Sequence, residues 1–244
     1  MITLCVAAAA VVLAAALGET LRMETAGYRT GKYIDYIETD GLRPAILFIH
    51  GGAWVFGDRT ACAELCEAFA GQYDTYACDY TLAAKGGRPC WEQTVRDIAE
   101  AVRWIRGRKG PRQVFLVGIS AGGHLALYHA ARHRDVHGVA AISAPTDLGG
   151  RFCESVERSV RLWAGSELEA ASVRPTLSMP PVCIVHGDFD DVVPVGHADT
   201  FVQECLEAGV QFEYHRFHSG VHCMSDHKEL TWRIVQDFLS ALVL

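Results

Sequence analysis

The chain has 244 residues, of which half are hydrophobic and 21% are charged. This composition is typical of a folded globular protein with one well-buried core, and it excludes an intrinsically disordered chain. The formal net charge is −7 and the sequence contains no cluster of lysine and arginine, so nucleic acid is not expected as a partner. No internal repeat or low-complexity linker follows the first twenty residues, which predicts a single domain over residues 19–244.

The first predicted element is an apolar N-terminal segment. Residues 2–18 are uncharged and rich in alanine, and Ala16-Leu17-Gly18 resembles the small-residue pattern of a signal-peptide cleavage site. Residues 1–18 are therefore expected to be a signal peptide or a membrane anchor, which favours a secreted or membrane-anchored protein over a cytoplasmic one. Two observations speak against this: no lysine or arginine precedes the segment, and a membrane-spanning helix usually needs roughly 20 residues. The alternative is a start of the chain that is merely apolar.

Beyond this segment, short apolar runs alternate with stretches in which apolar residues recur at helical spacing. The predicted strands are an edge strand over 33–38 and further strands over 45–50, 75–79, 113–117, 138–142, 182–186 and 211–217. The predicted helices cover 61–70, 91–106, 121–132, 195–208 and 228–242, with a small helical flap around 156–163. This alternation predicts an α/β protein with a mostly parallel sheet and helices on both faces. In such sheets the ligand site lies outside the carboxyl ends of the strands.

The sequence "GISAGGHLAL" places Ser120 between a predicted strand and a predicted helix. A serine with Gly118 and Gly122 on either side is typical of a nucleophile elbow, whose strained turn tolerates only small neighbours. The positive end of the following helix would also point at the site. A serine at this position can instead be an ordinary helix cap. The strand-to-helix context favours the nucleophile.

The sequence "FIHGGAWVFGD" follows a buried strand with two adjacent glycines. Acyl transfer creates a negatively charged oxygen, which fixed backbone N–H groups stabilise. We assign this oxyanion-hole role to the amides of Gly51 and Gly52, together with that of Ala121. His50 is expected to order this loop by hydrogen bonding rather than to act as a base or a metal ligand.

A nucleophilic serine needs a base and an orienting carboxylate. The sequence "IVHGDFDDVVP" offers three acids after a buried strand: Asp188, Asp190 and Asp191. Asp188 follows Gly187 at once and is expected to stabilise the turn, whereas Asp191 precedes the step into a helix and suits the surface. Asp190 is therefore the predicted acid of the triad.

The sequence "FHSGVHCM" offers two histidines after the next strand. His218 directly continues the strand, whereas His222 lies beyond Ser219-Gly220 on a loop long enough to reach Ser120. His222 is therefore the predicted base. The order serine, acid, histidine along the chain is the order expected for this fold class.

The nine cysteines predict neither a metal site nor a cofactor. Cys78 and Cys183 lie in apolar runs, where cysteine behaves as a small hydrophobic residue. No CxxC pair or Cys/His cluster has the spacing of a zinc site in the sequence. Loss of Cys5 with a signal peptide would leave an even number, which is compatible with disulfides without indicating them.

The chain resembles the small α/β-hydrolase esterases that carry an HGG-type oxyanion loop. These include hormone-sensitive-lipase-like and feruloyl/acetyl-xylan-esterase-like groups, kynurenine formamidase and isoprenylcysteine methylesterase. The resemblance extends over about residues 45–224 and is carried by "HGGAWVFGD", "DYTLAAKGGRPCWEQTVRDIAEAVRWI", "GISAGGHLAL" and "PPVCIVHGDFDDVVP". It implies an α/β-hydrolase fold with little or no cap, with Asp190 as the acid of an HG-x-x-D motif and His222 as the base. The chain departs from these relatives in "DYTLAAKGG", where they usually read DYRL and an acidic or proline-rich step, and in Cys223, where they often have glycine.

The sequence thus predicts a serine hydrolase that cleaves small carboxylic esters through an acyl-enzyme, without a metal or cofactor. The expected partner is a small-molecule ester, and the N-terminal segment allows membrane association. The short stretch between residues 142 and 181 leaves no room for a large lid, which predicts a preference for short acyl chains. Two alternatives are an amide hydrolase, resembling kynurenine formamidase or a peptidase, and a catalytically silent binding protein on the same fold.

Overall fold

The computed structural model describes residues 22–39, 42–108 and 112–244 of the chain. The predicted signal peptide or anchor over 1–18 lies outside the described residues. Within them, no helix combines the length and the apolar character needed to cross a membrane. The eight described cysteines are all free thiols.

The strands form one eight-stranded sheet in the order β1-β2-β4-β3-β5-β6-β7-β8. The strands from β4 to β8 in this order are parallel to one another, whereas β1 and β2 are antiparallel to their neighbours. The strands are β1 (Glu24–Arg29), β2 (Lys32–Ile37), β3 (Ala45–Ile49), β4 (Asp74–Cys78), β5 (Val114–Ile119), β6 (Gly138–Ile142), β7 (Val182–Gly187) and β8 (Phe212–Phe217). The mostly parallel sheet is the one predicted from the alternation of strands and helices.

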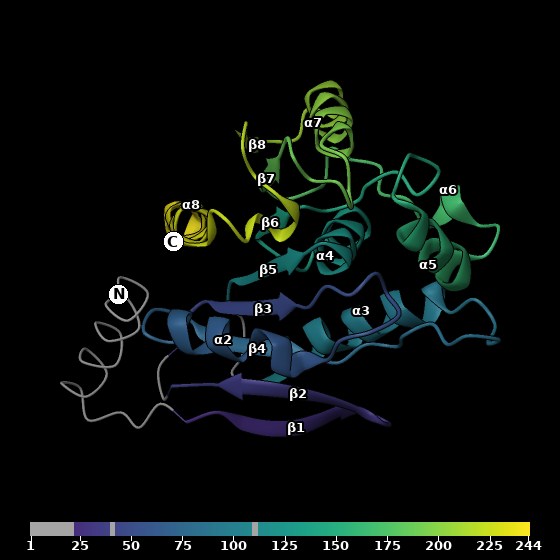
Figure 1. The fold of residues 1–244 in the computed structure, drawn as a ribbon. Coiled ribbons are helices and arrows are strands. Elements are labelled where there is room, and N and C mark those ends of the chain that lie inside the picture. Colours follow the sequence, from purple (N-terminus) through teal and green to yellow (C-terminus); the bar gives the residue numbers. More distant parts are fainter. Residues whose placement is uncertain (1–21, 40–41, 109–111) are drawn as a thin grey trace.

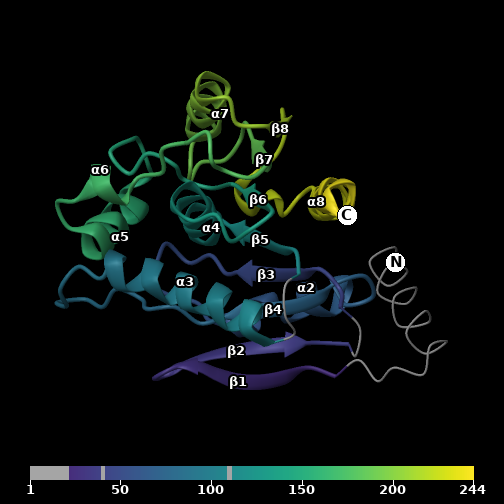
Figure 2. The ribbon, with the colours of Figure 1, turned by 180° about the vertical axis from the view of Figure 1, so that it is seen from behind.

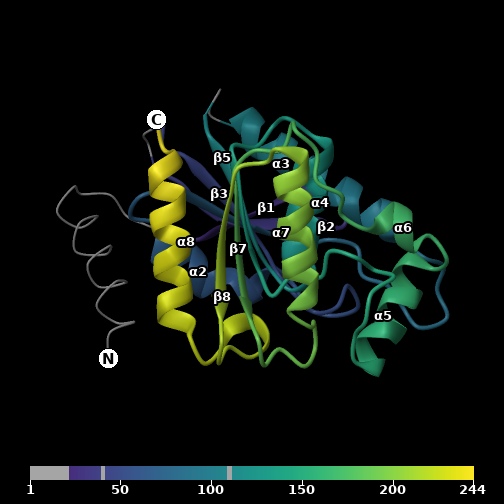
Figure 3. The same ribbon diagram turned by 90° about the horizontal axis from the view of Figure 1, so that it is seen from above.

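Helices cover both faces of this sheet, as predicted (Figure 3). One face packs on α2 and α8, and the other on α3, α4 and α7, around separate apolar cores. The helical elements are η1 (Arg59–Cys62), α2 (Ala63–Phe69), α3 (Trp91–Arg108), α4 (Ala121–Arg132), α5 (Glu154–Ala164), α6 (Leu168–Ala171), α7 (Gly196–Ala208), η2 (His222–Met224) and α8 (Lys228–Leu242). The central strands β3, β5, β6 and β7 are almost entirely buried, because both of their faces are covered.

The strand predicted over 33–38 is confirmed as β2, but its predicted position at the edge of the sheet is wrong, because β1 lies outside β2. The two strands form a hairpin, and Gly31 makes its turn with a φ of +67°. β1 has no buried residue and only Ala26 and Tyr28 among its side chains are partly covered. The strand was missed because backbone pairing holds it in place, without the apolar run that identifies a buried strand.

Helices α5 and α6 lie beyond the carboxyl ends of the central strands (Figures 1 and 2). The ring of Trp163 in α5 stacks on that of Trp54, with ring centres 4.8 Å apart and an interplanar angle of 12°. Its indole N–H donates to Thr94 Oγ1 at 2.9 Å. These contacts hold α5 over the loop after β3. Helix α5 is the small helical flap that was predicted around 156–163.

Candidate active site

The sharp turn at Ser120 depends on close backbone packing. Ser120 follows the last residue of β5 and precedes α4, with a φ of 54° that non-glycine residues rarely adopt. A Cβ atom on Gly118 would lie 2.2 Å from the Gly122 carbonyl oxygen, and one on Gly122 would lie 2.0 Å from the Ile49 carbonyl oxygen. Both positions therefore require glycine. The Ser120 side chain makes no capping hydrogen bond to α4, so it does not serve as an ordinary helix cap.

A continuous chain of hydrogen bonds joins Ser120, His222 and Asp190. The Ser120 hydroxyl and His222 Nε2 are 3.1 Å apart, and His222 Nδ1 lies 2.8 Å from Asp190 Oδ2. With Nδ1 protonated, His222 donates to the carboxylate and its Nε2 accepts from the serine. Both distances lie within the reach that proton transfer requires. The three residues come from the ends of β5, β7 and β8, so the parallel strands bring them to one edge of the sheet.

Asp190 is buried and held by several donors. Its Oδ1 accepts the amides of Val192 and Val193 at 3.0 and 2.8 Å. Its Oδ2 also lies 3.3 Å from His186 Nε2, which is 2.8 Å from the Val193 carbonyl oxygen. Burial alone would raise the pKa of Asp190, but the hydrogen bonds from His186 and His222 hold this pKa well below its usual range. Sequence reasoning missed His186, although it is the histidine of the HG-x-x-D motif.

The residue after His222 also contributes to the site. Burial would lower the pKa of His222, but its interactions with Asp190 and Cys223 outweigh burial and raise this pKa above its usual value. Cys223 has a φ of 60°, and its amide donates to Ser143 Oγ at 3.0 Å. Glycine adopts such a φ without steric cost, so glycine would also suit this position.

The other acids and the second histidine lie outside this chain of hydrogen bonds. Asp188 was expected to stabilise the turn after β7, but its carboxylate instead binds Arg216 Nε at 2.6 Å and His218 Nδ1 at 2.9 Å. The side chain of His218 is 88% exposed. Asp191 is exposed, as expected.

Ser120 and His222 line a cavity of about 310 Å³. Its other walls come from the loop after β3, from α5 and from the connections after β6, β7 and β8: Gly51, Gly52, Ala53, Trp54, Phe56, Pro145, Ser155, Val156, Ser159, Val192, Val193 and Cys223. Most of these side chains are apolar. Such a lining suits the hydrocarbon part of a small ligand.

The loop after β3 presents free backbone donors to this cavity. In the described part of the chain, the amides of Gly51, Gly52, Ala53 and Ala121 donate no hydrogen bond to another protein group. A Cβ atom on Gly52 would lie 2.0 Å from the Phe56 carbonyl oxygen, so this tight turn requires glycine. Ala53, which sequence reasoning did not select, follows with a φ of 47° and also lines the cavity.

His50 supports this loop from behind the cavity. Its ring stacks on that of Tyr80 with ring centres 4.1 Å apart, and its Nδ1 lies 2.7 Å from the Gly51 carbonyl oxygen. The Tyr80 hydroxyl donates to the His50 carbonyl oxygen at 2.9 Å. These contacts order the loop, and burial lowers the pKa of His50.

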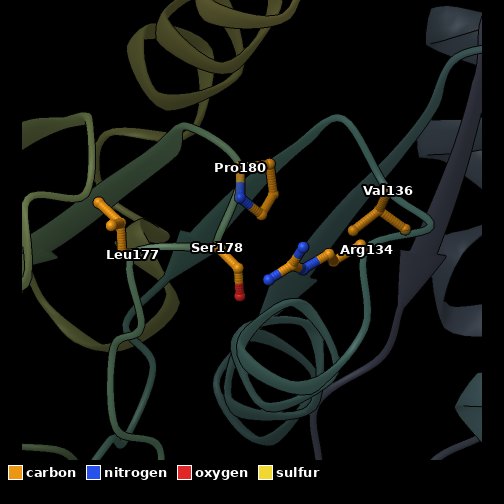
Figure 4. A pocket seen from close by; sticks show the side chains of 5 residues that line it. All are labelled: Arg134, Val136, Leu177, Ser178 and Pro180. Carbon is orange, nitrogen blue, oxygen red and sulfur yellow. The ribbon is translucent and has the colours of Figure 1, made fainter.

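A second, more open groove of about 420 Å³ lies in another part of the molecule (Figure 4). It is lined by Arg134, Val136, Leu177, Ser178 and Pro180, which precede β6 and β7. It therefore lies at the amino ends of these strands, and none of the predicted site residues lines it. The site after the carboxyl ends is the one at which parallel sheets bind ligands.

Comparisons with known proteins show the family to which the chain is similar. The BD-FAE family model matches residues 35–205, which include Ser120 and Asp190. Esterase LipC of Mycobacterium tuberculosis is 27% identical over 194 residues, covering 66% of this chain and 47% of LipC. Isoprenylcysteine alpha-carbonyl methylesterase ICME of Arabidopsis thaliana is 24% identical over 225 residues, covering 75% of this chain and 51% of ICME. The chain thus spans about half the length of these two curated relatives.

Solved structures confirm the predicted α/β-hydrolase fold. A thermophilic esterase, Est2 of Thermogutta terrifontis, has a TM-score of 0.76 at 23% identity and covers 89% of this chain and 91% of its own. An esterase of Pyrobaculum calidifontis has a TM-score of 0.79 at 20% identity and covers 100% of this chain and 93% of its own. At these sequence identities, the similarity to the solved structures shows the fold alone.

Proposed function

The chain belongs to the BD-FAE family, and we propose that it is a serine hydrolase of small carboxylic esters. Ser120 acts as the nucleophile, His222 as the general base and Asp190 as the orienting carboxylate. The observation that carries this proposal is the hydrogen-bonded chain from Asp190 through His222 to Ser120 at the wall of the cavity. The esterase names of the curated relatives support the same reaction class.

The geometry supports a two-stage reaction. Ser120 Oγ attacks the ester carbonyl carbon while its proton passes to His222 Nε2, and the carbonyl oxygen becomes an oxyanion. As the intermediate collapses, His222 returns this proton to the departing alcohol and leaves an acyl group on Ser120. Water then attacks the acyl-enzyme with His222 again as the base, which releases the acid and restores the serine.

The free amides beside Ser120 supply the oxyanion hole in this proposal. The three predicted donors Gly51, Gly52 and Ala121, and also Ala53, carry N–H groups that no protein acceptor occupies in the described part of the chain. Backbone donors held by a rigid turn are already oriented when the negative charge forms. Removing one oxyanion-hole donor typically lowers the rate by about 100- to 1000-fold.

Asp190 keeps His222 in the productive orientation. The low pKa of Asp190 means that its carboxylate stays charged throughout the reaction. It therefore fixes the proton on His222 Nδ1, leaves Nε2 free to accept, and stabilises the imidazolium that forms.

The cavity supports a small substrate. Its volume of about 310 Å³ lies at the lower end of the range of roughly 300–1,000 Å³ for ligand pockets. Val156 and Ser159 of α5 close one side of it. Acyl groups of a few carbons fit such a space.

A fluorophosphonate probe tests the proposal directly, because it phosphonylates only an activated serine. We expect the wild-type chain to gain one adduct by intact-mass measurement, mapped to Ser120, and to hydrolyse p-nitrophenyl acetate. Ser120→Ala is expected to do neither. Absence of labelling in folded wild-type protein would contradict the proposal and favour a binding protein. Faster turnover of formyl-kynurenine than of the acetate ester would favour an amide hydrolase.

A further inference from the structure

Strands β7 and β8 bring three side chains with metal-ligating atoms together, away from Ser120. Cys183 belongs to β7, and Glu213 and His215 belong to β8. The parallel register pairs Cys183 with Glu213. Because side chains alternate along a strand, Glu213 and His215 lie on the same face as Cys183. Their ligand atoms all lie within 4.8 Å of one another, and His215 Nε2 is 3.2 Å from Glu213 Oε2.

The three donors match the ligands of a tetrahedral zinc site. Zinc binds thiolate sulfur at about 2.3 Å and imidazole nitrogen or carboxylate oxygen at about 2.0–2.2 Å, so the ligand atoms of a tetrahedral site lie roughly 3.3–3.7 Å apart. His215 Nε2 and Glu213 Oε2 already lie about this close, whereas the group as a whole, within 4.8 Å, must contract by about 1 Å. Rotation of the two side chains on β8 would bring about this contraction, and both are partly exposed, Glu213 to 50% and His215 to 34%.

The charges of the three groups also suit a divalent cation in a partly buried position. Cys183 is fully buried, and an isolated thiolate there would be costly. One thiolate and one carboxylate together balance the charge of a divalent ion, and the imidazole is neutral. The thiol proton leaves to solvent when the metal binds.

We propose that Cys183, Glu213 and His215 form a site for a zinc-type divalent transition-metal ion, with water as the fourth ligand on the exposed side. None of the three residues lines the cavity beside Ser120. The ion therefore takes no part in ester hydrolysis. It joins the edge strand β8 to β7, and these two strands lead into the loops that carry Asp190 and His222. Its effect is to stabilise this edge of the sheet.

Zinc titration of the metal-stripped full-length chain tests the site. The parent protein should carry Cys223→Ser, so that the exposed thiol beside His222 does not bind zinc. By calorimetry we expect one site that loses at least about 100-fold in affinity in Glu213→Gln and in His215→Ala, since removal of even an outer-shell partner of a metal ligand costs about 10- to 100-fold. His218→Ala, which removes an exposed histidine just after β8, is the matched control and should bind zinc as the parent does. Zinc should raise the melting temperature of the parent but not of His215→Ala.

Cobalt identifies the sulfur ligand. Co²⁺ should give a thiolate-to-metal charge-transfer absorption in the parent that is absent in Cys183→Ala. If Cys183→Ala prevents folding, the zinc affinities of Glu213→Gln and His215→Ala test the site instead, because both side chains are at least partly exposed. The proposal is overturned if the parent binds no zinc, if binding survives both substitutions, or if the cobalt complex lacks the thiolate absorption. Every readout is independent of ester hydrolysis, so its failure is distinguishable from failure of the proposed esterase activity.

Discussion

Two aspartate–histidine pairs join the same two loops, and only one of them reaches Ser120. Asp190 and His222 are separated by 32 residues, with 2.8 Å between their hydrogen-bonded atoms. Asp188 and His218 are separated by 30 residues, with a corresponding distance of 2.9 Å. By the hydrogen bond alone, the two pairs are equivalent.

Their surroundings differ. The His222 side chain is 20% exposed and that of His218 is 88% exposed. Asp190 accepts two backbone amides, whereas Asp188 binds the side chain of Arg216. Water screens the exposed pair, so its interaction contributes little. Burial and the contact with Ser120, rather than the aspartate–histidine bond, distinguish a candidate catalytic pair from a surface pair.

Ser120→Ala gives the largest expected effect, because it removes the hydroxyl group that the Asp190–His222 pair contacts and the Asp188–His218 pair does not. We expect ester turnover to fall on the order of 10⁶-fold, as for loss of the nucleophile in serine hydrolases generally. Turnover of p-nitrophenyl acetate by the purified variant measures this, with circular dichroism as the control for folding. Wild-type turnover in the folded variant would refute the assignment of Ser120.

His222→Ala and His218→Ala separate the two histidines. We expect His222→Ala to lose turnover by about as much as Ser120→Ala, because the nucleophile and base act as one unit. His218→Ala should change turnover by less than about tenfold, since its side chain faces solvent. If His218→Ala proved the more damaging of the two, the placement of the base would be wrong.

Asp190→Asn and Asp188→Asn separate the two acids. Asparagine at 190 can still contact His222, but it cannot stabilise the imidazolium, so turnover should fall on the order of 10⁴-fold. Asp188→Asn loses only the contacts to Arg216 and His218, and its turnover should stay close to that of the wild type. Steady-state kinetics of both variants at one pH makes the comparison, and equal losses would contradict it.

The preference for acyl-chain length tests whether the loop that carries Asp190 also shapes the substrate cavity, because Val192 and Val193 of this loop line it. We expect acetate and butyrate esters to be turned over at least about tenfold faster than long-chain esters, since one methylene group in an apolar pocket is worth about 10-fold or more. Val156→Ala should enlarge the cavity and shift the preference towards longer chains. A series of p-nitrophenyl esters measures kcat/KM for both proteins, and faster hydrolysis of long-chain esters by the wild type would contradict a small cavity.

The smallest expected effect is a shift in the pH profile. The base must be neutral to accept the proton of Ser120, and the pKa of His222 is raised. Activity should therefore rise with pH, with a midpoint above the ordinary histidine value of about 6.5. Cys223→Ala removes one of the interactions that raise this pKa, so its midpoint should move down, whereas His218→Ala should leave it unchanged. A flat profile from about pH 5 to 9, with chemistry rate-limiting, would argue against a histidine base.

The sequence by itself determined the elements whose signals are local. The helix over 121–132 and the strand over 138–142 have the predicted boundaries, because apolar periodicity and small residues mark them directly. The elbow at Ser120 was predictable for the same reason, since Gly118 and Gly122 stand beside it. Loop length after each strand also sufficed to favour Asp190 and His222 as triad members, and their catalytic roles stay predictions until the variants are measured.

Tertiary structure alone decided the features that depend on pairing between distant segments. β1 lies at the edge through its hairpin with β2, although it lacks the apolar run of a buried strand. The contact of His186 with Asp190 and the positive φ of Cys223 follow from how the loops return to the sheet. Cys183 meets Glu213 and His215 through the register of β7 and β8, about thirty residues apart. Strand register is set by the packing of whole faces of a sheet, so the spacing of residues along the chain does not reveal it.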